Sequence, residues 1–214
     1  MLGEKRTFLK ESLGSIQDTG AIFPSSRWLA RELTSPIYRS EKPLRILEVG
    51  AGTGPITCEL VTQMRSKDSL TVVEINARMV ETLKRRIAQL PNYEQQCDSI
   101  DIFVGPIQDL PETEKFDVIV CALPFNNFTA DLCADILRKL QRLSHSETEL
   151  TYFEYLGLRR LGRMVYSNQN KTRLKQVHAF FRDLHAQNGM KKERVWLNIL
   201  PCTVYHLRLA HCAI

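Results

Sequence analysis

The run from Glu48 to Gly54 (EVGAGTG) is the part of the sequence with the clearest chemical content. It follows an apolar segment, residues 44–49, and precedes a helical pattern, residues 55–64, which predicts a strand, a glycine-rich turn and a helix. Glycines at such a turn let the backbone approach a ligand that lies over the carboxyl ends of parallel strands. Glu74 ends the next predicted strand, at a spacing that suits an acid binding the hydroxyls of a ribose. Together these features predict a site for a nucleoside-containing ligand.

The type of nucleoside follows from what the pattern lacks. Counted from Gly50, Pro55 stands where a dinucleotide fingerprint needs a small residue for close packing, which disfavours NAD. The sequence has no GxxxxGK[ST] run, so the phosphate cradle of a P-loop NTPase is missing. S-adenosylmethionine fits better, because its cationic methionine end suits an acid such as Glu48. We therefore expect S-adenosylmethionine as the cofactor, S-adenosylhomocysteine as its product, and no metal.

The elements that would position this site alternate between strands and helices. We predict strands at residues 44–49, 70–75, 100–104, 116–122, 150–155, 194–200 and 203–209, and helices at 55–64, 76–90, 129–143 and 172–187. Only Pro201 and Cys202 separate the last two strands, which predicts a tight hairpin. The expected fold is α/β and Rossmann-like, a mostly parallel seven-stranded sheet with an antiparallel edge strand and an N-terminal helical extension.

Composition and charge exclude several classes of protein. The 214 residues, 43% hydrophobic and 25% charged, are typical of one globular domain. Six scattered cysteines form no CxxC pair and no cluster with histidine, which disfavours zinc and a disulfide framework. The first twenty residues do not resemble a signal peptide, and the longest apolar run, Val118–Phe125, is too short to span a bilayer. We expect an intracellular protein.

The net charge of +5 is unevenly distributed. Residues 159–194 contain ten Lys and Arg against Asp183 and Glu193, a local charge of +8. This asymmetry favours a polyanionic partner, either an acidic membrane surface or nucleic acid, and a solvated helix face is the alternative. Residues 1–40 lie outside the alternating pattern and form either a helical lid or membrane contact or simply packing on the sheet. We place the main domain at residues 41–214.

The segment after the fourth predicted strand adds a resemblance. Leu123-Pro124-Phe125 resembles the (N/D)-x-P-(Y/F) loop of class I methyltransferases, which holds an acceptor nitrogen near the methyl group. The leading Asn or Asp is replaced by Ala122. Because a base-modifying enzyme would use that polar side chain on a nucleobase amine, its absence weakens a nucleic-acid interpretation.

Three further stretches resemble the bacterial phospholipid N-methyltransferases. They are residues 19–26 (TGAIFPSS), residues 152–155 (YFEY) followed by Arg159 and Arg160, and residues 194–201 (RVWLNILP). The resemblance runs from about residue 10 to 209 and implies methylation of phosphatidylethanolamine toward phosphatidylcholine. The chain departs from the family after the third strand, where Gly105-Pro106-Ile107 replaces Gly-Asp-Ala, so the contacts to adenine are open.

The resemblance and the residue chemistry together give candidate roles. Expected cofactor residues are Glu48, Gly50, Gly52, Gly54, Glu74, Ile75, Ile107, Ser25 and Ser26. Expected substrate residues are Phe125, Asn126, Arg159 and Arg160, with the arginines meeting a lipid phosphate. Expected catalytic groups near the amine are the Leu123 and Pro124 carbonyls, Glu154 and Tyr155; for each, a packed strand end or plain loop backbone is the alternative.

Other functions stay open at this point. An ornithine-lipid N-methyltransferase would share most features, and an rRNA adenine N6-methyltransferase shares the glycine run. A non-catalytic protein with the same fold would act as a membrane-surface module. We expect a monomer without a stable nucleic-acid partner, cytoplasmic and peripherally associated with the inner face of the cytoplasmic membrane through anionic lipids.

Overall fold

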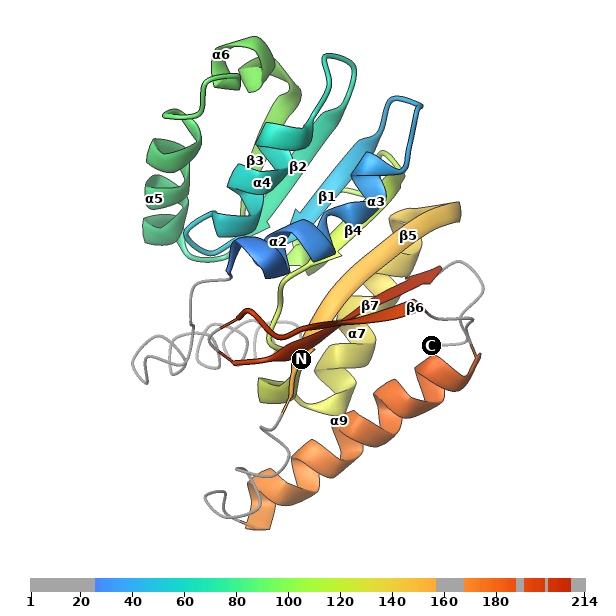
Figure 1. Cartoon of the computed structure of the whole chain (residues 1–214). Helices are drawn as coiled ribbons and strands as arrows, with labels where there is room; N and C mark the ends of the chain where they lie inside the picture. Colours follow the sequence, from blue (N-terminus) through green and yellow to red (C-terminus); the bar gives the residue numbers. More distant parts are fainter. Residues whose placement is uncertain (1–25, 157–167, 188–190, 199, 209–214) are drawn as a thin grey trace.

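The computed structural model describes residues 26–156, 168–187, 191–198 and 200–208, and it forms a single sheet with helices on both faces (Figure 1). The strand order is β3-β2-β1-β4-β5-β7-β6. The strands are β1 (Arg45–Val49), β2 (Ser69–Glu74), β3 (Ile100–Val104), β4 (Phe116–Cys121), β5 (Ser144–Tyr155), β6 (Lys191–Val195) and β7 (Cys202–Arg208). β1 to β5 pair in parallel, and β7 runs antiparallel to both β5 and β6. The predicted mostly parallel, seven-stranded sheet is confirmed, with its antiparallel strand in the hairpin that closes one side.

Helices cover the two faces of the sheet, as Figure 1 shows. The helices are α2 (Arg27–Leu33), α3 (Ser35–Tyr38), α4 (Pro55–Gln63), α5 (Ala77–Ile87), α6 (Tyr93–Gln96), α7 (Ala130–Arg142) and α9 (Asn168–Gln187), with short 3-10 turns η1 (Cys97–Ser99), η2 (Ile107–Asp109) and η3 (Phe125–Asn127). Buried side chains of α2, α4 and α5 share one core cluster, and those of α7 and α9 share the other. Each of these five helices thus buries apolar side chains against one face of the sheet.

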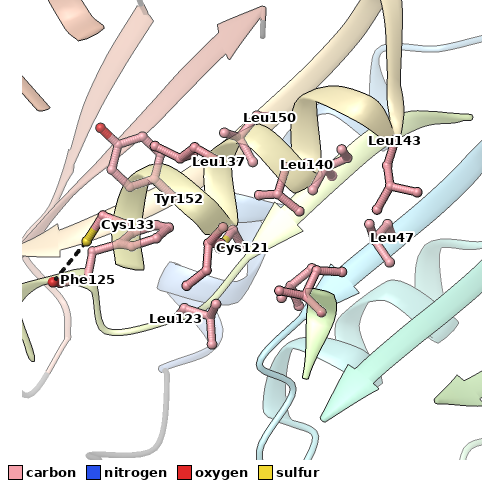
Figure 2. Close-up of a cluster of buried hydrophobic side chains, with 14 of the residues drawn as sticks. Leu47, Cys121, Leu123, Phe125, Cys133, Leu137, Leu140, Leu143, Leu150 and Tyr152 are labelled. Carbon is pink, nitrogen blue, oxygen red and sulfur yellow. Dashed lines mark hydrogen bonds between the residues drawn. The ribbon is translucent and has the colours of Figure 1, made fainter. Parts of the chain in front are cut away.

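Alternation along β1 sends its side chains to both faces. Leu47 and Val49 belong to the core under α7, part of which is drawn in Figure 2. Ile46 belongs to the core under α2 and α4. Glu48 has the same parity as Ile46, because successive side chains of a strand point to opposite faces. The acid at the start of the glycine run therefore lies on the α4 side.

Local chemistry explains where the helices next to the glycine run begin. Pro55 occupies the first turn of α4, where no backbone N–H is needed. Asn76 caps α5, because its side chain accepts hydrogen bonds from the N–H groups of Arg78 and Met79. Both helices thus start directly beyond the carboxyl ends of β1 and β2.

The hairpin differs from the prediction. β6 spans Lys191–Val195 rather than 194–200, and Val195 pairs with Cys202, which leaves residues 196–201 as the connection. The Asn198 side chain accepts a hydrogen bond from the Ser26 N–H and donates one to the Leu200 carbonyl, so the chain leaves the sheet here. The expected tight hairpin is therefore wrong, since the apolar residues Trp196, Leu197 and Leu200 lie in the connection and not in a strand.

The segment before β1 packs on one face of the sheet. Leu29, Ala30, Leu33 and Ile37 are buried in the same core cluster as β1 and α4. Residues 1–25 lie outside the described part of the chain. Within the described part, the boundary that we placed at residue 40 separates two segments that share one core.

Candidate cofactor site

The glycine loop, residues 50–54, leaves the carboxyl end of β1 in a conformation that favours glycine. Gly50, Gly52 and Gly54 have φ angles of +81°, +58° and +85°. A Cβ on Gly50 would lie 2.7 Å from Leu123, and one on Gly54 would lie 2.9 Å from Leu83. At Gly52 the nearest atom would be Met79 Sδ at 4.0 Å. The first and third glycines therefore serve close packing, and the middle one borders open space.

The Glu74 carboxylate lies directly beside this loop. Its Oε2 accepts a hydrogen bond from the Gly52 N–H at 2.8 Å, and its Oε1 accepts one from the Asn76 N–H at 2.9 Å. Two backbone donors thus fix both oxygens of a nearly buried side chain. Each oxygen retains further lone pairs, as a carboxylate that binds the hydroxyls of a ribose requires.

Glu48 is fully buried behind the glycine loop. Its Oε2 accepts a hydrogen bond from the Thr57 hydroxyl at 2.7 Å, whereas Oε1 has no hydrogen-bond partner. Burial raises the pKa of Glu48 to about 8, with a smaller contribution from the charge of Glu74, while the Thr57 hydrogen bond acts in the opposite direction. A buried acid with an orphaned oxygen is costly unless a ligand completes it.

The acceptor loop, residues 122–128, follows β4 and turns tightly at Pro124. Pro124 has φ −79° and ψ 74°, an inverse γ-turn, and the Leu123 carbonyl accepts a hydrogen bond from the Phe125 N–H at 2.9 Å. The Pro124 carbonyl accepts one from the Asn127 N–H at 2.9 Å. Each of the two predicted acceptor carbonyls therefore accepts one backbone hydrogen bond and retains a second lone pair.

Comparison with known proteins relates the chain to methyltransferases. Residues 46–146 match the family model described as "Methyltransferase domain". These 101 residues are just under half of the 214-residue chain. An O-methyltransferase from Bacillus cereus, solved in complex with SAH, matches 94% of this chain and 90% of its own with a TM-score of 0.61 at 16% identity. This likeness confirms the expected fold.

Two relatives of known name are similar to part of the chain. An ornithine lipid N-methyltransferase from Singulisphaera acidiphila is 28% identical over 129 residues, which cover 58% of this chain and 63% of that protein. An rRNA adenine N-6-methyltransferase from Lysinibacillus sphaericus is 27% identical over 139 residues, which cover 65% of this chain and 51% of that protein. The chain thus spans only about half to two thirds of each relative.

The residues present at the glycine loop fit S-adenosylmethionine. The orphaned Oε1 of Glu48 suits its cationic methionine end, Glu74 suits its ribose, and the open side of Gly52 admits the ligand to the backbone. When bound, this cofactor supplies a methyl group carried on a sulfonium. No cluster of three metal-ligating side chains occurs in the described part of the chain.

The other predicted cofactor residues have different surroundings. Ile107 is buried in the core under α7, and Ile75 packs against the same core at the end of β2. Ser26 caps α2, because its hydroxyl oxygen accepts a hydrogen bond from the Leu29 N–H at 3.2 Å. Ser25 lies outside the described residues. Ser26 is therefore committed to a helix start, and the two isoleucines form an apolar wall on the α7 side.

Phe125, predicted to contact substrate, is an anchor of the acceptor loop. Its ring is only 2% exposed and lies edge-on to Tyr152 at 5.8 Å and 5.0 Å from Phe181 of α9. The Cys133 thiol also donates to the Phe125 carbonyl at 3.7 Å (Figure 2). The next residue, Asn126, is half-buried. The Phe125 ring thus holds the loop to β5 and α9, and its carbonyl holds the loop to α7.

Glu154 and Tyr155, both predicted to act on the amine, lie on opposite faces of β5. Glu154 accepts a hydrogen bond from the Tyr205 hydroxyl at 3.5 Å, on the α9 side. Tyr155 packs against Phe153, 5.1 Å between ring centres, in the core on the α2 side. Burial raises the pKa of Tyr155 to about 12, so it stays protonated near neutral pH. The structure therefore separates these two side chains.

The predicted phosphate contacts Arg159 and Arg160 lie outside the described residues. Part of the basic stretch is described, and Lys175, Arg182, Lys191, Lys192 and Arg194 are all exposed. None of the described helices is long and apolar enough to cross a membrane.

Sequence reasoning missed Thr57 and Asn198. Thr57 donates its hydroxyl to Glu48, and Asn198 joins the β6–β7 connection to α2. Neither partnership has a local signal, because the partners are brought together by the packing of separate elements. The run at residues 194–201 that resembles the phospholipid N-methyltransferases includes Asn198 but does not indicate its partner.

Proposed function

We propose that this protein transfers methyl groups from S-adenosylmethionine to the amine head group of a membrane lipid. The observation that carries the cofactor half of the proposal is the buried Glu48 oxygen without a partner, beside the fixed carboxylate of Glu74. The likeness to an ornithine lipid N-methyltransferase over 58% of the chain supports the lipid half. The resemblance of the sequence to phospholipid N-methyltransferases also supports a lipid acceptor.

The chain's own residues contribute to catalysis more by positioning the acceptor amine than by transferring a proton. Methyl transfer to an uncharged amine is an in-line displacement, for which alignment and exclusion of water supply much of the rate. The free lone pairs of the Leu123 and Pro124 carbonyls suit the N–H groups of the acceptor amine. Glu154 is the candidate proton acceptor, because the high pKa of Tyr155 excludes its phenolate near neutral pH.

Two lipid head groups fit this proposal. The sequence resemblance favours phosphatidylethanolamine and its methylated intermediates, and the named relative favours an ornithine lipid. Both present a primary amine close to an anionic or polar head group. The loss of a polar side chain at Ala122 favours either lipid over the nucleobase amine suggested by the rRNA-modifying relative.

The test is a methyl-labelling assay with separated acceptors. Purified protein is incubated with methyl-labelled S-adenosylmethionine and vesicles containing phosphatidylethanolamine or an ornithine lipid, with rRNA in parallel. We expect label in one of the two lipids, and the number of labelled products gives the number of transfers. Label in RNA alone, or in no acceptor, would overturn the proposal.

The cellular setting follows from this function. A monomer bound peripherally to the inner face of the cytoplasmic membrane would reach such lipids, with anionic lipids as the partner of its basic surface. Fractionation of cells that express the chain with a short tag tests this location.

A further inference from the structure

Three large apolar side chains are exposed at the edge of the sheet that carries the cofactor site. Trp28 of α2 is 41% exposed, and Trp196 and Leu197 in the β6–β7 connection are 62% and 66% exposed. β7 is antiparallel to both β5 and β6, so β6 runs in the same direction as β1. The chain beyond β6 therefore emerges at the edge where the glycine loop follows β1. Single exposed apolar residues are ordinary, but a group of them at one edge marks a contact surface.

Hydrogen bonds hold the segments that carry these side chains together. The Ser26 N–H, two residues before Trp28, donates to Asn198 Oδ1, two residues after Trp196, at 3.0 Å. The Leu156 N–H just beyond β5 donates to the Pro201 carbonyl at 2.6 Å. Figure 1 shows the start of α2 next to the β6–β7 connection. The connection is thus fixed to α2 and to the end of β5, while Trp196 and Leu197 stay exposed.

Basic residues stand beside these side chains in the sequence, and the nearest acids, Glu32 and Glu193, lie four residues from Trp28 and three residues from Trp196. The Arg27 guanidinium lies 5.1 Å from the centre of the Trp28 ring, and Arg194, two residues before Trp196, is exposed. Residues 26–31 and 194–202 contain no Asp or Glu. Tryptophan prefers the head-group level of a bilayer, and arginine pairs well with lipid phosphate. This combination complements an anionic bilayer.

We propose that Arg27, Trp28, Arg194, Trp196 and Leu197, here named the tryptophan surface, dock the protein on an anionic lipid bilayer. The inference rests on the proposed function, because docking at this edge would bring lipid head groups toward the acceptor loop and Glu154. It differs from contact through the basic stretch alone, since Trp196 and Leu197 enter the lipid while the two arginines meet phosphates. The affinity then has an apolar part that salt does not screen.

The chain has two tryptophans, and both belong to this surface, so its intrinsic fluorescence reports on the contact directly. The probe is a vesicle of phosphatidylcholine and phosphatidylglycerol, with pure phosphatidylcholine as comparison. We expect a blue shift on addition of the mixed vesicles and quenching by brominated acyl chains. Trp28→Phe and Trp196→Phe variants assign the signal to each ring.

The binding test uses a double substitution and a matched control. We expect Trp196→Ser with Leu197→Ser to lower the affinity for mixed vesicles about tenfold or more. Tyr38→Ser is the control, because Tyr38 is an aromatic residue of similar exposure, 63%, in α3 and outside the tryptophan surface. Vesicle binding equal to that of the parent in the double variant would overturn the proposal, and so would sedimentation with vesicles without any change in fluorescence.

Activity separates this inference from the proposed function. The double variant should keep the parent's affinity for S-adenosylmethionine and its transfer to lipid dispersed in detergent, and lose transfer to lipid in vesicles. If the parent docks through its tryptophans but labels no lipid, the proposed function fails and the surface stands. If the parent labels lipid while its tryptophans are unaffected by vesicles, the surface fails and the proposed function stands.

Discussion

Gly50 and Leu123 are packed so closely that a Cβ on Gly50 would lie 2.7 Å from Leu123 Cδ2. The Ala122 N–H also donates to the Val49 carbonyl at 2.8 Å, beside the same contact. The glycine loop, which fits the cofactor, and the acceptor loop therefore meet without room for one methyl group. A substitution that displaces one loop should therefore displace the other.

Gly50→Ala should damage both loops. Its φ of +81° costs a side chain about 1–2 kcal/mol, and displacement of Leu123 adds to this, so the free energy of unfolding should fall by more than that strain alone. Gly52→Ala is the matched comparison, because φ is +58° there but its Cβ would meet only Met79 at 4.0 Å. We expect Gly52→Ala to lose cofactor affinity with a smaller loss of stability. Equal denaturant midpoints for the two variants would contradict this.

Glu48 should make the ligand-free protein less stable as the pH rises. Its pKa is about 8 in the folded protein against an ordinary value of 4.5, so the folded state retains a proton that the unfolded chain has released. This contribution is full below pH 4.5 and is lost as the pH rises through 8. Glu48→Gln does not titrate, so its stability relative to the parent should increase over this range. Denaturant unfolding at a series of pH values measures the difference, and parallel curves for the two proteins would refute it.

Cofactor affinity should show the opposite dependence on pH. A cationic ligand end beside Glu48 favours the ionised carboxylate, so binding releases a proton while the pH is below about 8. The affinity for S-adenosylmethionine should then rise with pH, by at most about tenfold per unit. Thr57→Val removes the hydroxyl hydrogen bond to Glu48 and raises the pKa of Glu48 further, so this variant should bind S-adenosylmethionine more weakly at pH 7. Thr62→Val, in the same helix and exposed, is the control for calorimetric titration.

Glu74→Gln should disturb the loop as well as the ribose contact. Both Glu74 oxygens accept hydrogen bonds from backbone N–H groups, of Gly52 and Asn76, and an amide can offer only one oxygen. One N–H loses its acceptor, at a cost of about 1–3 kcal/mol of stability. We expect cofactor affinity to fall about tenfold or more in the same variant. Thermal unfolding and titration calorimetry test the two effects separately, and an unchanged melting temperature would show that these hydrogen bonds contribute little.

His185 should make the α9 packing sensitive to acid. Burial, with the nearby charge of Lys192, lowers the pKa of His185 to about 4, and its Nε2 is hydrogen bonded to the Tyr152 hydroxyl. Because the unfolded chain takes up this proton at higher pH, the contribution to stability is full above pH 6.5 and is lost as the pH falls toward 4. His185→Phe keeps the ring against Tyr205, 4.7 Å away, and should remove this loss. Near-ultraviolet circular dichroism between pH 7 and 4 follows the aromatic cluster, and the same acid transition in both proteins would exclude His185 as its cause.

The sequence predicted most of the parallel half of the fold because those strands carry a local signal. β3 was predicted with its observed bounds, and β1, β2 and β4 to within a few residues at each end, since short apolar runs closed by glycine or by a polar cap are unambiguous. Glu48, the glycine loop and Glu74 could also be placed from spacing, because the carboxyl ends of adjacent parallel strands meet at one edge. The bounds of the hairpin could not be predicted, since Trp196 and Leu197 have the hydrophobicity of strand residues but lie in an exposed loop.

What the sequence determined by itself was therefore the fold class, together with a predicted cofactor and the edge of the sheet that is expected to hold it. Only the tertiary structure decided on which face of the sheet each candidate side chain lies. Glu154 and Tyr155 are adjacent in sequence but point to opposite faces of β5, because the strand geometry alternates up to its last residue. Thr57 and Asn198 became visible as partners only when α4, α2 and the hairpin were packed on the sheet. Such contacts join distant parts of the chain, so their chemistry depends on packing and has no signature in local sequence.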